Sequence, residues 1–378
     1  MDLNAIVVVE EGTGDSPCEA LSGNAPAFCE VLGRPVLHRI LQDLRRQGVG
    51  AMRVISEKPA PPLPVHSSFD ASQIQFTTAP QPWRAAESEC ADLMQANPDA
   101  VLVLRLGPYV EIDVDALLQH HFDNPYHVTG TKTPAGERLD VFVVSASRRN
   151  DAVYMFRHQL REFRSECGTY VFRGYWNPLR TARDLRALAI DALLQRNRIV
   201  PDGHEVRPGV WLGAGARIER GARVLAPVYL GARSRVRRNA VVTRCSVLEH
   251  HATVESGSVV ENSTVLPYAA IGAGLDIANS VVGNRRLVHL VRNVEVEITD
   301  PKLLDAVAQS SSWRTLGRAA ALAGFLPAQF IRGVLAKSRR PSAQLPAAVN
   351  TPSPALKTPA AFQAPAAAEA ARFPSKWS

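Results

Sequence analysis

The sequence is poor in cysteine and lacks the spacing that most cysteine sites need. Its 378 residues include only five cysteines, and no two of them form a Cys-x-x-Cys pair. An odd number of scattered cysteines indicates reduced thiols, which argues against a disulfide framework and against a zinc site. We therefore expect a protein of a reducing compartment.

Long apolar runs are missing as well. No stretch approaches the roughly 18 to 20 apolar residues that cross a bilayer, and no basic residue precedes the first apolar run, Ala5 to Val9. A secretory signal would need such a basic start. These absences predict a cytoplasmic protein.

Acidic residues are absent between Ala306 and Ala368. This stretch holds seven basic residues, which equals the formal net charge of +7 of the whole chain. The remainder is neutral overall, so we expect no nucleic-acid partner. Segment 313–337 mixes arginine with large apolar residues. It predicts that 313–340 lies on an anionic membrane surface, at the inner membrane face, or alternatively docks on the protein itself.

What the sequence does have is a period of six. Beginning at Val206, an aliphatic residue recurs at every sixth position, and from Leu212 onward a mostly small residue follows each one after four positions. The aliphatic positions are Val206, Leu212, Ile218, Val224, Leu230, Val236, Val242, Leu248, Val254, Val260 and Leu266. Such a period fits short strands and tight corners stacked coil upon coil, with the large side chain inside. After Leu266 we expect a slip of one residue, to Ile271 and Ile277.

This pattern resembles the hexapeptide-repeat proteins, whose left-handed parallel β-helix takes three hexads per coil. The resemblance implies a β-helix over residues 201–299, which serves either as an oligomerisation module or as the site of an acyltransferase. His250 and His251 are the imidazoles inside the repeat, and either could be the general base of an acyltransferase. A solvated pair at a corner is the alternative.

The first 200 residues alternate between apolar and amphipathic segments. Strands are predicted over 5–9, 52–55, 100–105 and 140–144, and helices over 35–47, 84–96, 114–121 and 182–196. This alternation predicts an α/β domain over residues 1–200, with a mostly parallel sheet covered on both faces.

Three segments of this domain carry a more specific resemblance. They are Ala5–Gly48, which contains EEGTG and later GRP, Val101–His121, VLVLRLGPYVEIDVDALLQHH, and Gly174–Leu194, which begins GYWNPLRT. In this order they resemble the sugar-1-phosphate nucleotidyltransferases of the mannose-1-phosphate guanylyltransferase type. The resemblance covers about residues 3 to 290. It implies a Rossmann-like nucleotidyltransferase domain, here shortened between the second and third segments, followed by the β-helix.

The family transfers a nucleotidyl group from an NTP to a sugar phosphate and uses Mg²⁺. The resemblance implies that Gly12, Thr13 and Gly14 form the nucleotide-binding phosphate loop. The family's basic residue after that loop is replaced by Asp15, and its lysine after the following proline is replaced by Ala27. An acid at the loop would repel the triphosphate.

Two family metal ligands are replaced by proline. The acid positions are Pro108 and Pro178 in this chain, and proline offers neither a carboxylate nor a backbone N–H. Nearby acids that could supply a substitute site are Glu10, Glu11, Asp113, Asp115 and Asp184, although acids at helix starts commonly complement the helix dipole. We therefore expect no cofactor, with Mg²⁺ only if the nucleotidyltransferase is active.

Together these observations favour a catalytically degenerate family member, acting as a regulatory or scaffolding subunit of sugar-nucleotide or surface-polysaccharide metabolism. It would assemble with itself or another chain through the β-helix and could still bind an NTP or a sugar phosphate. The alternatives are an active sugar-1-phosphate nucleotidyltransferase and a hexapeptide-repeat acyltransferase. Beyond residue 299 we expect a helical basic segment, 300–337, starting with a helix over 301–309, and then a disordered tail rich in proline and alanine, 338–378.

Overall fold

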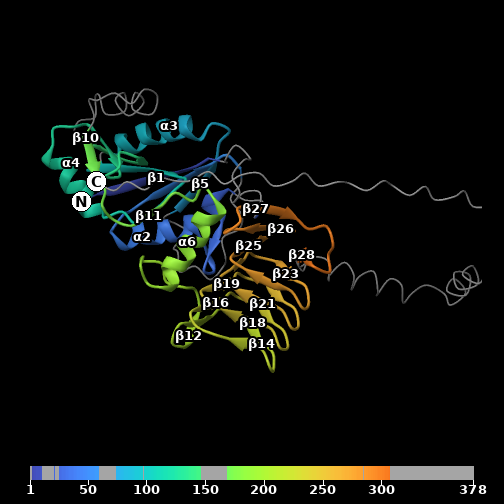
Figure 1. The fold of residues 1–378 in the computed structure, drawn as a ribbon. Helices are drawn as coiled ribbons and strands as arrows, with labels where there is room; N and C mark the ends of the chain where they lie inside the picture. The colour runs from blue at the N-terminus through green and yellow to red at the C-terminus, as the bar shows by residue number, and fades with distance from the viewer. Residues whose placement is uncertain are drawn as a thin grey trace, which may run out of the picture. The chain divides into compact units, whose positions relative to one another are not determined.

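The computed structural model describes residues 2–10, 21, 25–58, 74–96, 98–145, 168–283 and 285–306. They belong to one compact unit, Met1–Ser312. It is a mixed α/β structure with several parallel sheets (Figure 1). The predictions for 313–340 and 338–378 lie outside the described residues. Within the described part, no helix is long and apolar enough to cross a membrane.

The amino-terminal half is built on a seven-stranded sheet with the order β10-β8-β9-β6-β1-β4-β5. Its strands are β1 (Leu3–Val9), β4 (Met52–Ser56), β5 (Ile74–Thr78), β6 (Ala100–Leu106), β8 (Val128–Lys132), β9 (Arg138–Ser145) and β10 (Gly168–Val171). β1 runs parallel to β4 and β6, and β4 runs parallel to β5, whereas β9 is antiparallel to both of its neighbours. The expected mainly parallel sheet is confirmed.

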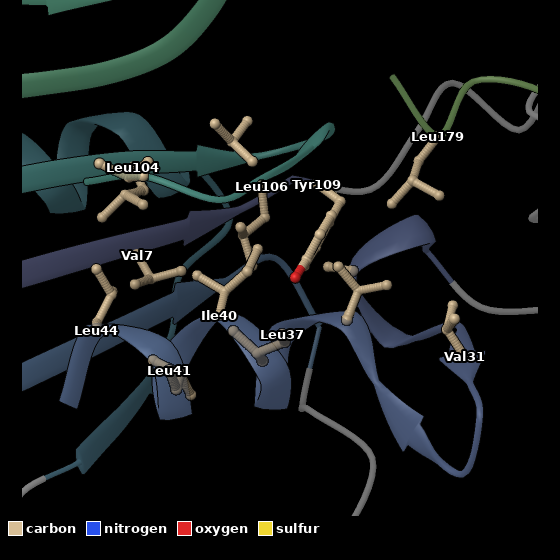
Figure 2. Packing of buried hydrophobic residues seen from close by; sticks show 14 of the residues in the cluster. Val7, Val31, Leu37, Ile40, Leu41, Leu44, Leu104, Leu106, Tyr109 and Leu179 are labelled. Atoms are coloured by element: carbon tan, nitrogen blue, oxygen red, sulfur yellow. The ribbon is translucent and has the colours of Figure 1, made fainter. Parts of the chain in front are cut away.

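Helices cover both faces of this sheet. They are α2 (Val36–Arg46), α3 (Pro82–Gln95), α4 (Val114–Asp123) and α6 (Ala182–Leu193). Every residue of β1 is buried, as expected for a central parallel strand. Val7 packs in the same cluster as the apolar face of α2, while Ile6 and Val8 pack with α3 on the other side. Figure 2 shows Leu37, Ile40, Leu41 and Leu44 of α2 beneath Val7, Leu104 and Leu106.

Local sequence sets the helix ends. α3 begins at Pro82, a residue that suits the first turn because its missing N–H would be unpaired there anyway. α6 begins with a capping box, in which Thr181 and Asp184 bond each other's backbone N–H. The predicted helices lie within a few residues of those observed.

The carboxyl-terminal half, His204–Ala306, is a stack of short strands in three sheets, hereafter the three-sheet stack. The first sheet contains β12 (His204–Arg207), β13 (Val210–Leu212), β16 (Val228–Leu230), β19 (Ser246–Leu248), β22 (Thr264–Val265), β25 (Ser280–Gly283), β26 (Arg286–His289) and β27 (Val294–Glu297). The second contains β14 (Arg217–Ile218), β17 (Arg235–Val236), β20 (Thr253–Val254), β23 (Ala269–Ile271) and β28 (Leu304–Ala306). The third contains β15 (Arg223–Val224), β18 (Val241–Thr243), β21 (Val259–Glu261) and β24 (Asp276–Ala278).

Strands in the stack pair in parallel at a spacing of three hexads. Val210 lies beside Val228 and Arg217 beside Arg235, so the first coils contain 18 residues. Later strands pair at 17 residues, as Leu248 does with Val265. The predicted slip is therefore real but occurs earlier than expected. Val265 takes the inward position, and Leu266 packs instead with the core of the α/β half.

Two other predictions are wrong in part. Val206 and Ile218 were expected inside the stack, but they are 42% and 39% exposed because they belong to its terminal coil. The helix expected over 301–309 does not form in its described part. Residues 301–303 form a turn, and Leu304–Ala306 forms β28, which pairs antiparallel with β23. Pairing with an open strand edge satisfies this backbone better than an isolated helical turn would.

Candidate functional site

The order of the parallel strands points to one edge of the α/β sheet. The chain adds β4 and β5 on one side of β1 and then crosses to add β6 on the other side. In open α/β sheets, ligands bind outside the carboxyl ends of the strands at such a reversal point. The candidate site therefore lies where β1 ends at Val9 and β6 ends at Leu106.

A cavity of about 500 Å³ opens at this edge, on the side covered by α3. Its lining residues come from the start of α3, the end of β6 and the start of β9, namely Trp83, Arg84, Glu87, Arg105, Arg138, Asp140 and Phe142. Volumes of this size accommodate small-molecule ligands. The mixture of arginines with an aromatic ring suits an anionic ligand that carries a flat group.

Two of the three arginines that line this cavity, Arg105 and Arg138, already have anionic partners. Arg105 donates to Glu10 at 2.5 Å and to Asp140 at 3.3 Å, and its guanidinium lies 5.9 Å from the ring centre of Trp83. Arg138 also pairs with Asp140, at 3.2 Å. Burial lowers the pKa of Arg138, and the nearby Arg105 acts in the same direction. An incoming phosphate would have to displace these carboxylates.

The structure brings Pro108 and Pro178 together. β7 (Tyr109–Val110) pairs antiparallel with β11 (Trp176–Asn177), with Asn177 beside Tyr109. Continuing this register by one residue sets Pro178 opposite Pro108, just beyond the carboxyl end of β6. The two positions at which the resemblance implied metal ligands are therefore neighbours, and neither offers an oxygen from its side chain.

Asp113 and Asp184 have structural roles instead. Asp113 caps α4 by accepting a hydrogen bond from the N–H of Ala116 at 3.1 Å. Asp184 accepts from the N–H groups of Arg180 and Thr181 in the capping box of α6. Both carboxylates satisfy N–H groups at helix starts, which typically stabilises a helix by about 1 kcal/mol.

The expected phosphate loop, Gly12, Thr13 and Gly14, lies outside the described residues. In the described part of the chain, no group of three or more His, Cys, Asp or Glu side chains is arranged to hold a metal ion.

A second arrangement of buried polar groups joins the two halves. β2 (Glu30–Val31) and β3 (Arg34–Pro35) form a hairpin whose turn residues, Leu32 and Gly33, both have positive φ. The carboxylate of Glu249, from the three-sheet stack, accepts hydrogen bonds from both turn N–H groups, at 2.7 and 2.8 Å. This side of the hairpin therefore docks on the three-sheet stack through the Glu249 carboxylate, which is only 1% exposed.

Arginines tie the other side of the hairpin. Arg39 of α2 donates to the carbonyls of Val31, Leu32 and Val200. Arg34 bonds Asp202, whose own N–H donates to the Leu32 carbonyl. We call this arrangement around Glu249 the hairpin clamp. It fixes the α/β half on the stack mainly through Glu249 and Arg39, which are almost entirely out of water.

The two histidines of the repeat lie at the rim of the hairpin clamp. Nδ1 of His250 hydrogen-bonds Glu30, and the imidazole packs edge-on against Tyr268 with ring centres 4.6 Å apart. His251 has a positive φ and stacks on the same tyrosine. The solvated corner pair is therefore wrong for His250, which holds the hairpin, while His251 is half-buried at a corner.

Glu249, the buried carboxyl of the hairpin clamp, has a raised pKa. Burial, together with repulsion from Glu30, raises the pKa of Glu249 to about 7, against the effect of its two N–H donors. Burial lowers the pKa of His250, but the hydrogen bond and charge of Glu30 outweigh it and leave the pKa raised. Both folded-state pKa values lie above those of an unfolded chain, so the folded state binds more protons than the unfolded state.

Stability is therefore expected to fall as the pH rises. The contribution of Glu249 is complete below the ordinary glutamate pKa of 4.5 and is lost as the pH passes about 7, a change of about 3 kcal/mol. Urea unfolding at several pH values measures it. Glu249→Gln, which cannot titrate, should flatten the profile between these limits. An unchanged slope in the variant would rule out Glu249 as its source.

Several of these residues were not found by sequence reasoning. The available signal for Arg105 was a charge near the end of an otherwise apolar strand. The signal for Trp83 was its place directly after a proline at a helix start. Glu249 gave no signal, because a polar residue beside an inward leucine is ordinary in a hexapeptide repeat.

Comparison with known proteins adds no assignment, since no family model and no curated protein matches this sequence.

Proposed function

We propose that this protein is a catalytically degenerate relative of the sugar-1-phosphate nucleotidyltransferases. In this proposal, the α/β half is a Rossmann-like nucleotidyltransferase domain, the three-sheet stack is a left-handed β-helix, and the chain is a regulatory or scaffolding subunit of sugar-nucleotide or surface-polysaccharide metabolism. Support comes from the three resembling segments, the reversal of strand order between β1 and β6, and the coils of three hexads.

The observation that carries the proposal is the pairing of β7 with β11, whose register sets Pro108 and Pro178 at neighbouring positions. Nucleotidyl transfer needs cations to neutralise the charge that develops on the phosphates, and Mg²⁺ prefers carboxylate and water oxygens. Two prolines at the carboxyl end of β6 supply no such ligand. The nearby acids Asp113 and Asp184 each bond the N–H groups of a helix start.

The cavity beside this position supports the same conclusion. In a working site, guanidinium groups would be available for the phosphates, whereas here Arg105 is shared between Glu10 and Asp140. Opening these pairs to admit a phosphate would expose two carboxylates to a like-charged ligand. The cavity is better suited to hold its own ion pairs than to bind a triphosphate.

A pyrophosphate-release assay tests the proposal. The purified chain, with Mg²⁺, each of the four common NTPs and several hexose 1-phosphates, should show turnover far below the ~10 s⁻¹ that is typical of enzymes. Pro108→Asp with Pro178→Asp serves as the comparison, since it returns two carboxylates to neighbouring positions. Robust turnover by the unmodified chain would establish the active nucleotidyltransferase instead.

A specific observation also favours the acyltransferase alternative. Glu30 holds His250 through Nδ1, as a carboxylate orients the imidazole in many general-base sites. Against it, the imidazole packs on Tyr268 and is largely buried. Binding of an acyl-CoA to the intact chain would decide for this alternative.

A further inference from the structure

The two ends of the three-sheet stack carry opposite charge. Residues 204–238 contain eight arginines and two glutamates, a net charge of +6. Residues 239–306 contain five basic and eight acidic residues, a net charge of −3. The stack is therefore polarised along its axis, from a basic amino-terminal end at β12, β14 and β15 to an acidic carboxyl-terminal end at β24, β27 and β28 (Figure 1).

Both ends also expose apolar side chains. Of the twelve exposed large hydrophobic residues in the described part of the chain, seven lie at these two ends. At the amino-terminal end they are Val206, Ile218 and Leu225, and at the carboxyl-terminal end Val291, Val294, Val296 and Leu303. Apolar surface bordered by charged side chains is typical of an interaction site.

The charges lie on the edge strands of all three sheets. At the amino-terminal end, the outermost strand of each sheet carries an arginine, Arg207 on β12, Arg217 on β14 and Arg223 on β15. At the carboxyl-terminal end, the outermost strands carry acids, namely Glu295 and Glu297 on β27, Asp305 on β28 and Asp276 on β24. Among the described residues, no further strand pairs with the outer edges of these six strands.

The third sheet shows how two such ends would match. Its register runs from Arg223 through Val241 and Val259 to Asp276, in parallel strands. A further coil in the same register would place its equivalent of Arg223 beside Asp276, at the strand spacing of about 4.8 Å. Opposite charges on adjacent strands attract, and the backbone groups of the open edges would pair at the same time.

We propose that a second copy of this chain binds head to tail, with the basic amino-terminal end of one three-sheet stack on the acidic carboxyl-terminal end of the next. Charge disfavours the two symmetric end-to-end arrangements. Two amino-terminal ends in contact would place arginines against arginines, and two carboxyl-terminal ends would place carboxylates against carboxylates. The contact is heterologous, so each copy keeps one free end and assembly continues until a ring closes or a filament forms. This inference is independent of whether the α/β half catalyses.

Sedimentation velocity of the full chain, over a range of concentrations and salt, tests the contact. We expect association that weakens as the ionic strength rises from about 0.05 to about 0.5 M, because exposed ion pairs are screened. Arg217→Gln with Arg223→Gln should weaken association about 10-fold. Asp276→Asn with Asp305→Asn should weaken it by a similar factor, because these acids lie on β24 and β28, the opposite edge strands of the sheets that carry Arg223 and Arg217.

The matched control removes two exposed arginines from the α/β half, by Arg46→Gln and Arg173→Gln, and should associate as the parent chain does. An equimolar mixture of the amino-end and carboxyl-end variants retains one intact contact and should stop at a 1:1 pair. The proposal is wrong if the parent chain stays monomeric, or if either end variant associates like the control. Binding of the amino-terminal end to anionic lipid vesicles, with no self-association, would assign that end to a membrane instead.

Discussion

Glu249→Ala is expected to lower the free energy of unfolding by about 2 to 6 kcal/mol. The substitution leaves the N–H groups of Leu32 and Gly33 buried without an acceptor, and each such group costs about 1 to 3 kcal/mol. Urea unfolding near pH 4 should show the full effect, because the contribution of Glu249, whose pKa is raised, is complete only below about pH 4.5. The loss should become smaller toward pH 8.

The comparison for this experiment is another glutamate of the three-sheet stack. Glu255 keeps 42% of its side chain exposed and approaches Arg237 at 3.6 Å, so Glu255→Ala should cost no more than about 1 kcal/mol. If Glu249→Ala costs no more than this control, the two halves are held together by something other than the hairpin clamp. A change in the urea dependence would further show that the halves unfold separately.

Gly33→Ala is expected to destabilise the chain by about 2 to 5 kcal/mol. Alanine is strained in the left-handed backbone conformation of this position, and its Cβ would overlap neighbouring atoms. Its φ is +88°, and a Cβ there would lie 2.2 Å from the hydroxyl oxygen of Tyr229 and 2.9 Å from Cβ of Asp202. Thermal or urea unfolding measures the loss. The fully buried Tyr229 has little room to move.

Gly48→Ala separates the two contributions. Gly48 has nearly the same φ, +84°, but nothing lies within 4 Å of the position of its Cβ. Gly48→Ala should therefore lower the free energy of unfolding only by the backbone contribution, about 1 to 2 kcal/mol. Adding Tyr229→Phe to Gly33→Ala should recover part of the difference, since the nearest atom is then absent. Equal losses at both glycines would show that the contact with Tyr229 does not matter.

Much of the local structure was predictable, because it depends on residues close in sequence. The period of six predicted stacked coils, and the resemblance to hexapeptide-repeat proteins implied three hexads in each. The apolar runs predicted the central strands, and their alternation with helices predicted a mostly parallel sheet. The predictions of burial fail where the packing around a residue differs from that of a regular coil. Ile218 is exposed because no described coil covers its side of the stack, and Leu266 turns to the other core because its coil is one residue shorter.

The candidate site was predictable only in part. The sequence marked Pro108 and Pro178 by resemblance, but it could not show that the pairing of β7 with β11 makes them neighbours. It offered Asp113 and Asp184 as possible ligands, and their hydrogen bonds show that both cap helices. Whether an acid binds a metal or caps a helix depends on where folding places its backbone. The periodicity of the sequence does not carry that information.

The sequence by itself determined the alternating α/β half, the repeated coil and the uneven charge along the chain. The tertiary structure decided which distant groups meet. Glu249 bonds Leu32 across 217 residues. This contact gives the hairpin its partner, while the burial of the carboxyl and the nearby Glu30 raise its pKa. Contacts of such separation arise from packing of whole elements, whose outcome no local pattern encodes. For the same reason, only the folded stack shows an arginine on each amino-terminal edge strand and an acid on each carboxyl-terminal one.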